Sequence, residues 1–276
     1  MHRHHSSVMP GILYGTAWKK ERTATLVEQA LRQGFRGIDT ACQPKHYHEP
    51  GVGEGIAAAA GAGIGRADLY LQSKFTALQG QDPQRVPYDP QAPLAEQVQQ
   101  SLQRSLHNLR CDYLDCLLLH SPMPSTAQTL QVWQAMEGLL EQGFVRQLGI
   151  SNCYDPALLA FLYNSVRVPP RVVQNRFYAA TGFDREIRLF CRERQMHYQS
   201  FWTLTANPDL LSHPLLVGLA ERYHKSPAQI LLRYLTQVGV TPLTGTSSQR
   251  HMQEDLAIFS FALQGGECDA LARLLV

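Results

Sequence analysis

The stretch GFRGIDTACQPKHYHEPGVGEGI, residues 34–56, decides the fold of this chain. It opens as a short apolar strand that ends in an acid, Asp39, and then runs into a polar loop rich in histidine. In parallel α/β folds, functional sites are built at the carboxyl ends of the strands. The stretch therefore predicts a parallel sheet with Asp39 at its functional edge.

The same order of apolar strand, polar loop and amphipathic helix recurs along the chain. The first helix is indicated by apolar residues at helical spacing, namely Ala24, Leu26, Val27, Ala30 and Leu31, and Gly34 ends it. Strands are predicted at residues 12–16, 35–40, 69–75, 113–120, 145–151, 171–177, 196–202 and 239–245. Further helices are predicted near residues 51–60, 92–109, 128–142, 155–163, 184–194 and 213–238.

Eight strands that alternate with helices predict an α/β protein with a closed (β/α)8 TIM barrel. The length of 276 residues suits one such domain, because these barrels routinely run to about 250 residues. An open doubly wound sheet is the alternative, but the chain lacks a glycine-rich phosphate-binding fingerprint after its first strand. We expect a flexible tail over residues 1–9 and one barrel domain over residues 10–276.

Composition narrows the function classes. Hydrophobic residues at 44% and charged residues at 17% argue against a disordered or fibrous chain. A net charge of +2, with scattered Lys and Arg, argues against nucleic acid or an anionic membrane as the main partner. The six cysteines form no CxxC pair, so we expect reduced thiols. A small molecule is the expected partner of a monomer or small homo-oligomer.

The amino terminus, MHRHHSSVMPG, lacks the apolar core of a signal peptide, and no run of about 18 apolar residues occurs. We therefore expect a cytoplasmic protein. His2, His4 and His5 fit a frayed polar terminus better than a metal site.

Polar residues recur where the predicted strands end, and in a barrel these ends share one rim. They are Asp39, Lys74, His120, Ser151, Asn152 and Gln174. Each alone fits a solvated strand end, but their convergence predicts an active site. The loop over residues 76–93 follows a strand directly and is unusually long, so we expect it to form a wall of the substrate pocket.

Five motifs in this order resemble those of the aldo-keto reductase family, from about Pro10 to the end of the chain. GFRGIDTA, followed by Tyr47 and by E-x-x-V-G at Glu49, Val52 and Gly53, resembles the family's first motif. LQSKFT and LLLHSP resemble its lysine and histidine strands, and VRQLGISN and VVQN its cofactor-amide motifs. The resemblance implies a TIM barrel that reduces aldehydes or ketones to alcohols with NAD(P)H.

The resemblance also implies a catalytic tetrad of Asp39, Tyr47, Lys74 and His120. Tyr47 would donate a proton to the carbonyl oxygen, where negative charge develops. Lys74 would favour its phenolate, Asp39 would hold Lys74 in place, and His120 would orient the carbonyl. CQPKH makes the interval from Asp39 to Tyr47 longer than in most members, which leaves His46 and His48, on either side of Tyr47, as alternative donors.

The resemblance assigns Ser151, Asn152 and Gln174 to the nicotinamide carboxamide of the cofactor. Thr16 is also expected to bind the cofactor. A helix cap for Ser151 and Asn152, and a buried structural amide for Gln174, are the alternatives. Gln199 best matches the position of the aromatic that stacks on the nicotinamide in the family. Its neighbour Tyr198 points to the opposite side by strand alternation, while Phe201 or Trp202 would line the pocket.

At the last strand, Leu243 replaces a basic residue with which the family selects the cofactor's phosphate. Thr244 and Arg250, with His251 competing for the arginine position, would form the anion site together with the hydroxyls of Thr246, Ser247 and Ser248. NADP is therefore the expected cofactor, and NAD the alternative.

We expect Trp18, Tyr88 and Trp202 to form substrate walls, although Trp18 fits plain packing equally well. Aromatic walls favour an apolar carbonyl compound. The chain stops soon after its last helical pattern, so we expect the pocket to be more open than in members with a long carboxyl-terminal tail.

Two other functions remain open. A metal-assisted barrel hydrolase or isomerase would use Asp39, His46, His48 and His120 as ligands. A noncatalytic regulatory subunit would bind the nicotinamide cofactor without turnover.

Overall fold

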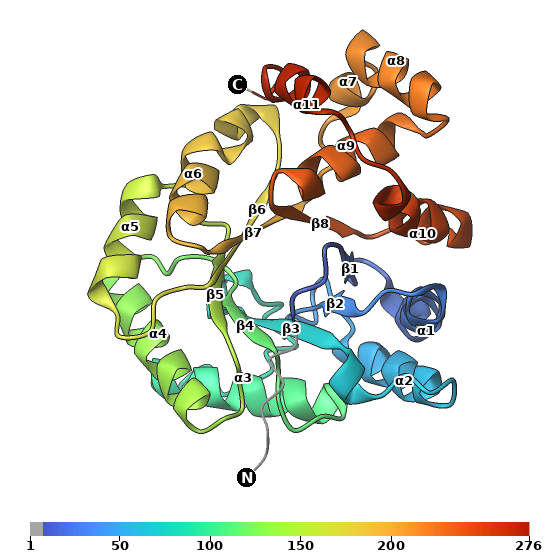
Figure 1. Cartoon of the computed structure of the whole chain (residues 1–276). Coiled ribbons are helices and arrows are strands. Elements are labelled where there is room, and N and C mark those ends of the chain that lie inside the picture. Colours follow the sequence, from blue (N-terminus) through green and yellow to red (C-terminus); the bar gives the residue numbers. More distant parts are fainter. Residues whose placement is uncertain (1–7, 276) are drawn as a thin grey trace.

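A computed structural model describes residues 8–275, and these form a closed barrel of eight parallel strands surrounded by helices (Figure 1). The strands pair in chain order, and β8 closes the barrel against β1. They are β1 (Leu13–Gly15), β2 (Gly37–Asp39), β3 (Tyr70–Phe75), β4 (Cys116–Leu119), β5 (Leu148–Ser151), β6 (Val172–Arg176), β7 (His197–Phe201) and β8 (Val240–Thr244). The predicted (β/α)8 barrel is therefore confirmed.

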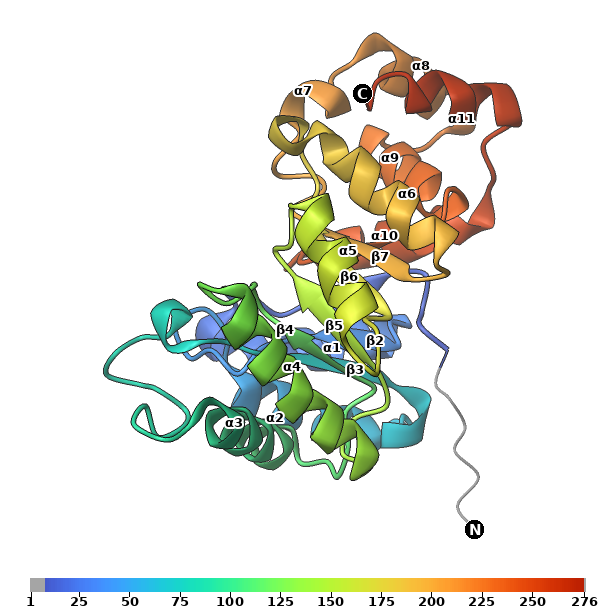
Figure 2. The same cartoon turned by 90° about the vertical axis from the view of Figure 1, so that its left-hand side faces the viewer.

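The helices cover the outside of the barrel. They are α1 (Thr23–Gln33), α2 (Glu49–Ala60), α3 (Leu94–Leu109), α4 (Thr126–Glu141), α5 (Pro156–Ser165), α6 (Arg185–Glu193), α7 (Pro208–Leu211), α8 (Pro214–Tyr223), α9 (Pro227–Gln237), α10 (Gln249–Leu256) and α11 (Gly265–Ala272). In Figure 2, α7, α8 and α11 lie together at one end of the molecule. Arg222 of α8 forms an ion pair with Glu267 of α11 at 2.6 Å.

The single helical segment predicted over residues 213–238 is wrong in one respect, because it contains two helices. His224 ends α8 in the left-handed conformation with φ of 52°. Ser226 caps the next helix by accepting a hydrogen bond from the backbone of Gln229, and Pro227 stands in its first turn. A serine cap followed by proline is a start signal, so the local sequence explains the break.

Two glycines of the opening stretch let α2 approach its neighbours closely. A Cβ atom on Gly53 would lie 2.1 Å from the backbone oxygen of Asn108, at the end of α3. A Cβ on Gly55 would lie 2.5 Å from the backbone oxygen of Ala24 in α1. The glycines therefore let α2 pack closely against α1 and α3, directly after the loop that carries Tyr47.

The two faces of the strands serve different cores. A large apolar cluster fills the space between the strands and the helices, with Trp133 among its buried members. A small cluster of Leu13, Tyr70, Cys116, Leu118 and Val172 lies apart from it. Because side chains alternate along a strand, the inward-facing positions above this second cluster are free to carry polar groups.

The ends of the described chain bear on the expected amino-terminal tail and on the expected openness of the pocket. His2, His4 and His5 lie outside the described residues, whereas Met9, which we expected in the tail, packs against the small apolar cluster. At the other end, α11 lies on α8, and no described residue after Asp255 lines the large pocket. No helix within residues 8–275 is long and apolar enough to cross a membrane.

Candidate active site

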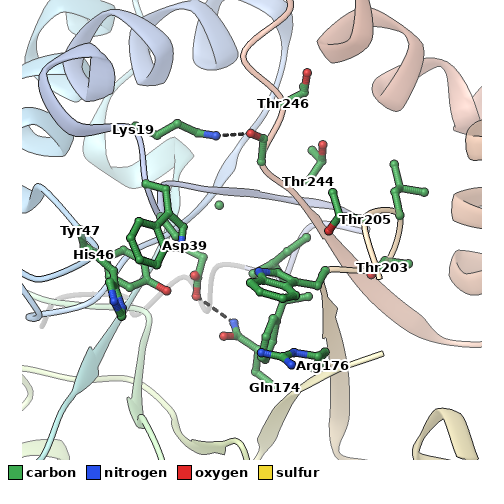
Figure 3. Close-up of a pocket in the computed structure, with 18 of the residues that line it drawn as sticks. Lys19, Asp39, His46, Tyr47, Gln174, Arg176, Thr203, Thr205, Thr244 and Thr246 are labelled. Carbon is green, nitrogen blue, oxygen red and sulfur yellow. Dashed lines mark hydrogen bonds between the residues drawn. The ribbon is translucent and has the colours of Figure 1, made fainter. Parts of the chain in front are cut away.

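A cavity of about 1160 Å³ opens where the strands end, and it brings together residues from most of the barrel's strand ends (Figure 3). Of the residues assigned to the site from the sequence, these line it: Trp18, Asp39, Tyr47, His120, Ser151, Asn152, Gln174, Trp202, Thr244 and Arg250. Lys74, Thr16, Gln199 and Tyr88 do not line it.

Asp39 and Lys74 form a buried ion pair beneath this cavity. The Lys74 Nζ lies 2.6 Å from Asp39 Oδ2 and also donates to the backbone oxygen of Thr40 at 2.9 Å. Burial by itself lowers the pKa of Lys74, but Asp39 and Tyr47 outweigh it, so that this pKa lies above its ordinary value. The lysine therefore stays charged although its side chain is only 1% exposed.

Two glutamines hold the other oxygen of the Asp39 carboxylate, and a third glutamine supports them. Gln72 Nε2 and Gln174 Nε2 donate to Asp39 Oδ1 at 2.7 and 2.8 Å. Both also donate to Gln199 Oε1, and Gln199 Nε2 donates back to Gln72 Oε1 at 3.0 Å. Each amide hydrogen of Gln72 and Gln174 thus has an acceptor, and the carboxylate is fixed from both sides. We call Gln72, Gln174 and Gln199 the glutamine cage.

Tyr47 lies between Lys74 and His120. The Lys74 Nζ is 5.2 Å from the centre of the Tyr47 ring, and the Tyr47 and His120 rings are 6.1 Å apart in an edge-on arrangement. Burial raises the pKa of the Tyr47 hydroxyl, and the charge of Lys74 opposes that rise. The phenol is therefore protonated, next to a cation that favours its phenolate.

The long interval between Asp39 and Tyr47 is absorbed by a hydrogen-bonded turn. The backbone oxygen of Gln43 accepts from the N–H groups of His46 and Tyr47 at 3.1 and 3.0 Å. The N–H of Trp18 donates to the backbone oxygen of His46 at 2.7 Å, and Gln43 Nε2 donates to the backbone oxygen of Gly80 at 2.7 Å. The CQPKH insertion is thus tied to both neighbouring loops and still directs Tyr47 into the cavity.

The two alternative donors lie elsewhere. His46 lines the cavity with its ring stacked on Trp18, 4.1 Å between centres, on the wall beside Tyr47. His48 is exposed at the start of α2 and does not line the cavity. Tyr47 is therefore the residue of this loop that adjoins Lys74.

His120 is held as a neutral imidazole. Its Nδ1 lies 2.6 Å from the Thr76 hydroxyl, and its backbone oxygen accepts from Asn152 Nδ2 at 2.9 Å. Burial lowers the pKa of His120 to about 3, with Lys74 and His46 contributing. A neutral ring can present one N–H to a ligand oxygen without adding a second positive charge near Lys74.

The residues assigned to the carboxamide meet at the ends of β5 and β6. Ser151 Oγ donates to the backbone oxygen of Gln174 at 2.7 Å, and Asn152 Nδ2 is near Ser151 Oγ at 3.3 Å. Asn152 adopts a left-handed backbone conformation with φ of 53° and accepts from the Tyr154 hydroxyl. Gln174 commits its Nε2 to the cage, which leaves its Oε1 as the acceptor toward the cavity.

Three of the predicted contacts are wrong. Gln199 cannot stack on a cofactor, because it is fully buried in the glutamine cage; two residues further along the same face of β7, Phe201 lines the cavity instead. Thr16 is also fully buried, and its hydroxyl donates to the backbone oxygen of Asp39. Tyr88 is buried too, and its hydroxyl donates to the backbone oxygen of Thr76.

The loop over residues 76–93 forms a wall only at its beginning, where Thr76 and Gly80 line the cavity. Gln81 Nε2 donates to the backbone oxygens of Cys42 and Thr76, at 2.9 and 3.1 Å. Together with Tyr88, Gln81 folds the loop back on β3 and on the Tyr47 loop.

At the end of β8 the cavity has mixed charge. Thr244 Oγ1 donates to Asp255 at 2.6 Å, and burial raises the pKa of Asp255 to about 6. Arg250 pairs with Glu254 at 2.8 Å and is largely exposed. Lys19, which we did not assign to the site, donates to the backbone oxygen of Gly245 (Figure 3).

Two tryptophans line the cavity from different loops. Trp18 follows β1 and Trp202 follows β7, and both line the cavity although 59% and 49% of their surfaces are exposed. Both have left-handed backbone conformations, with φ of 63° and 56°, which bulky residues rarely adopt. Such strain concentrates at functional sites. Trp18 and Trp202 therefore line the cavity, and their contact with a substrate stays a prediction.

The alternative of a metal-assisted hydrolase or isomerase requires a group of metal ligands. Within residues 8–275, no three His, Cys, Asp or Glu side chains are grouped as metal ligands. Asp39, which that alternative requires as a ligand, is already engaged by Lys74 and by two amides.

Comparison with known proteins identifies the family. The model of the aldo/keto reductase family matches residues 10–275, nearly the whole chain. The chain belongs to the aldo/keto reductase family. This membership confirms an oxidoreductase that reduces carbonyl compounds with a nicotinamide cofactor.

Individual aldo/keto reductases agree with this assignment. A glyoxal reductase of Bacillus subtilis is 29% identical, over 90% of this chain and 82% of the relative. The 2,5-diketo-D-gluconic acid reductase B of a Corynebacterium species is 31% identical, over 89% of this chain and 81% of the relative. The crystal structure of an aldo/keto reductase from Brucella melitensis has a TM-score of 0.82 at 31% identity, covering 96% of this chain and 95% of the other.

The position of Gln199 in the glutamine cage predicts that this residue contributes to stability and not to cofactor binding. Replacing Gln199 with Leu removes an acceptor from two buried amides, so the free energy of unfolding should fall by about 1–3 kcal/mol. Cofactor affinity should change less than threefold, because the side chain lies outside the cavity. Urea unfolding and cofactor titration by tryptophan fluorescence measure the two effects. A large loss of cofactor affinity at unchanged stability would instead support the stacking role.

Proposed function

We propose that this aldo/keto reductase reduces aldehydes or ketones to alcohols with Tyr47 as the proton donor. The observation that carries the proposal is the position of Tyr47, which adjoins the charged Lys74 and the neutral His120 at the wall of the cavity. A carbonyl that accepts hydride develops negative charge on its oxygen and needs a donor within hydrogen-bond reach.

Each residue of the proposed tetrad has its own role in proton transfer. Tyr47 gives its phenolic proton to the carbonyl oxygen, and the phenolate that forms is stabilised by the ammonium of Lys74. Asp39 keeps this ammonium charged and in place, and the glutamine cage keeps Asp39 in place. When Thr76 donates to His120 Nδ1, the ring proton is on Nε2, from which it orients the carbonyl oxygen.

The residues at the ends of β5 and β6 fit a nicotinamide carboxamide. Gln174 Oε1 and the Ser151 hydroxyl are acceptors for its amide hydrogens, and these partners are uncharged, as a neutral amide requires. Phe201, at the end of the neighbouring strand β7, adds an apolar side chain to the lining of the cavity. When bound, the cofactor supplies the hydride.

The end of the cavity at β8 fits the anionic part of the cofactor. Lys19, Thr246, Arg250 and His251 line it, and Ser248 caps α10 there. Helix amino ends and basic side chains are the usual partners of phosphate groups. This cluster supports NADP, because Arg250 and His251 compensate for Leu243.

The walls support a carbonyl compound with an apolar body. Trp18 and Trp202 present aromatic surface, and Phe201 adds to it. Relatives named for glyoxal, methylglyoxal and 2,5-diketo-D-gluconic acid reduction act on small dicarbonyl compounds. We propose a small aldehyde or ketone as the substrate. The alternative of a noncatalytic binding subunit is less favoured, because the complete tetrad is assembled.

Within this proposal, the first prediction concerns the proton donor. Replacing Tyr47 with Phe keeps the ring between Lys74 and His120 but removes the proton, so kcat should fall at least 100-fold. The cofactor dissociation constant should stay within about threefold, since Tyr47 is not among the proposed cofactor contacts. A stopped-flow assay at 340 nm with 4-nitrobenzaldehyde measures turnover, and His46→Ala serves as the matched control with retained activity. Full activity of Tyr47→Phe would exclude it as the donor.

The second prediction concerns the cofactor. NADPH should bind more tightly than NADH, and Arg250→Ala should weaken NADPH binding by about tenfold while leaving NADH binding nearly unchanged. Quenching of tryptophan fluorescence gives both dissociation constants. Equal affinities in the unaltered protein, or equal losses in the variant, would favour NAD.

A further inference from the structure

Arg176 ends β6 and extends the row of functional side chains toward the mouth of the cavity. It lies two residues after Gln174, on the same face of the strand and about 7 Å further along it. Arg176 lines the cavity together with Asn152 and Phe201. Figure 3 shows its side chain next to Gln174.

Aromatic rings hold the guanidinium in one place. Its central carbon lies 4.1 Å from the centre of the Trp202 ring and 5.3 Å from that of Tyr178. Cation–π stacking of this kind fixes the plane of the group but leaves its N–H edges free to donate. Arg176 is therefore positioned without being neutralised.

The hydrogen-bonding capacity of Arg176 is unused within the described chain. No carboxylate of residues 8–275 pairs with it, and its side chain donates no hydrogen bond to another described residue. Its Nε is buried from solvent and has no hydrogen-bond partner among residues 8–275. A buried donor on a charged group costs free energy unless a ligand satisfies it.

The charged residues that line the cavity are not evenly paired. Its three acids are committed: Asp39 to Lys74, Glu254 to Arg250 and Asp255 to Thr244. That leaves Lys19 and Arg176 as cations without an acidic partner in the described part of the chain. Lys19 lies by the phosphate end at Gly245, whereas Arg176 lies by the residues assigned to the neutral carboxamide. A neutral amide does not pair with a cation, so the charge of Arg176 is available to an anionic group other than the proposed carboxamide.

We propose that Arg176 binds a carboxylate on the substrate, so that the preferred substrates are aldehydes or ketones that carry a carboxylate beyond their apolar part. The proposal rests on the proposed reductase function and narrows its substrate class. The planar guanidinium matches a carboxylate bidentately, and Trp202 packs over the connecting chain or ring. Arg176 is thereby a specificity-determining residue, and Tyr47 and His120 remain the groups at the reacting carbonyl.

A matched substrate pair tests the proposal. 4-Carboxybenzaldehyde and 4-formylbenzamide have nearly the same shape but differ in charge, so kcat/KM should favour the carboxylate by roughly 10- to 100-fold. Arg176→Met should abolish this preference through KM and leave the amide substrate within about threefold, which controls for damage to the Trp202 wall. Arg176→Lys should restore part of the preference. Equal values for the two substrates in the unaltered protein would overturn the proposal.

A binding assay separates this proposal from the reductase function. 4-(Hydroxymethyl)benzoate and its carboxamide analogue are titrated against the cofactor-loaded protein by tryptophan fluorescence, without need of turnover. Tighter binding of the benzoate that is lost in Arg176→Met supports the carboxylate site even if no carbonyl is reduced. If Arg176→Met instead weakens NADPH binding more than tenfold and leaves ligand preference unchanged, the anion is the cofactor's pyrophosphate and the proposal is overturned.

Discussion

The buried carboxylate of Asp39 is the constraint on which the rest of the site depends. An isolated charge in the interior of a barrel is strongly unfavourable, and it is tolerated only when it is paired and hydrogen-bonded. Lys74 neutralises one oxygen, and amides of the glutamine cage saturate the other. Removing one partner of such a pair typically costs about 3–5 kcal/mol. The same contacts that make the charge tolerable also fix the cation next to Tyr47.

Gln174 connects this constraint to the cofactor site. Its Nε2 donates to Asp39 while its side chain lines the cavity at the place proposed for the carboxamide. The Gln174 side chain therefore holds Asp39 and would also hold the cofactor. A carboxamide held by Gln174 would therefore lie close to the ion pair, and the turn built on Gln43 brings Tyr47 to the wall of the same cavity.

The fold could be predicted because the apolar periodicity of each strand and helix is local. The proximity of Asp39, Lys74 and His120 could be predicted because these residues occur at or next to strand ends, and that of Tyr47 because its motif follows Asp39 in order; their catalytic roles stay predictions. The errors arise where longer-range packing decides. The burial of Gln199 and Thr16 depends on how deep in the barrel each residue lies, which the sequence does not show. The burial of Tyr88 depends on its loop folding back against β3, which the sequence does not show either. Counting every second residue from Gln199 along β7 would have indicated Phe201 as the side chain of that strand face that lines the cavity. Arg176 was missed because the absence of an acidic partner has no local signal in a sequence.

The pKa of Lys74 reports whether Asp39 keeps the buried ammonium charged. Asp39→Asn retains the shape of the side chain but removes its charge, so burial should then lower the pKa of Lys74 below its ordinary value of about 10.4. An NMR titration of ¹³C-labelled lysine in the unaltered protein and in this variant measures the shift, with Lys74→Met to assign the signal. In the unaltered protein the pKa of Lys74 should lie above the ordinary value, and in the variant it should fall by at least about one unit. The same pKa in both proteins would contradict this role of Asp39.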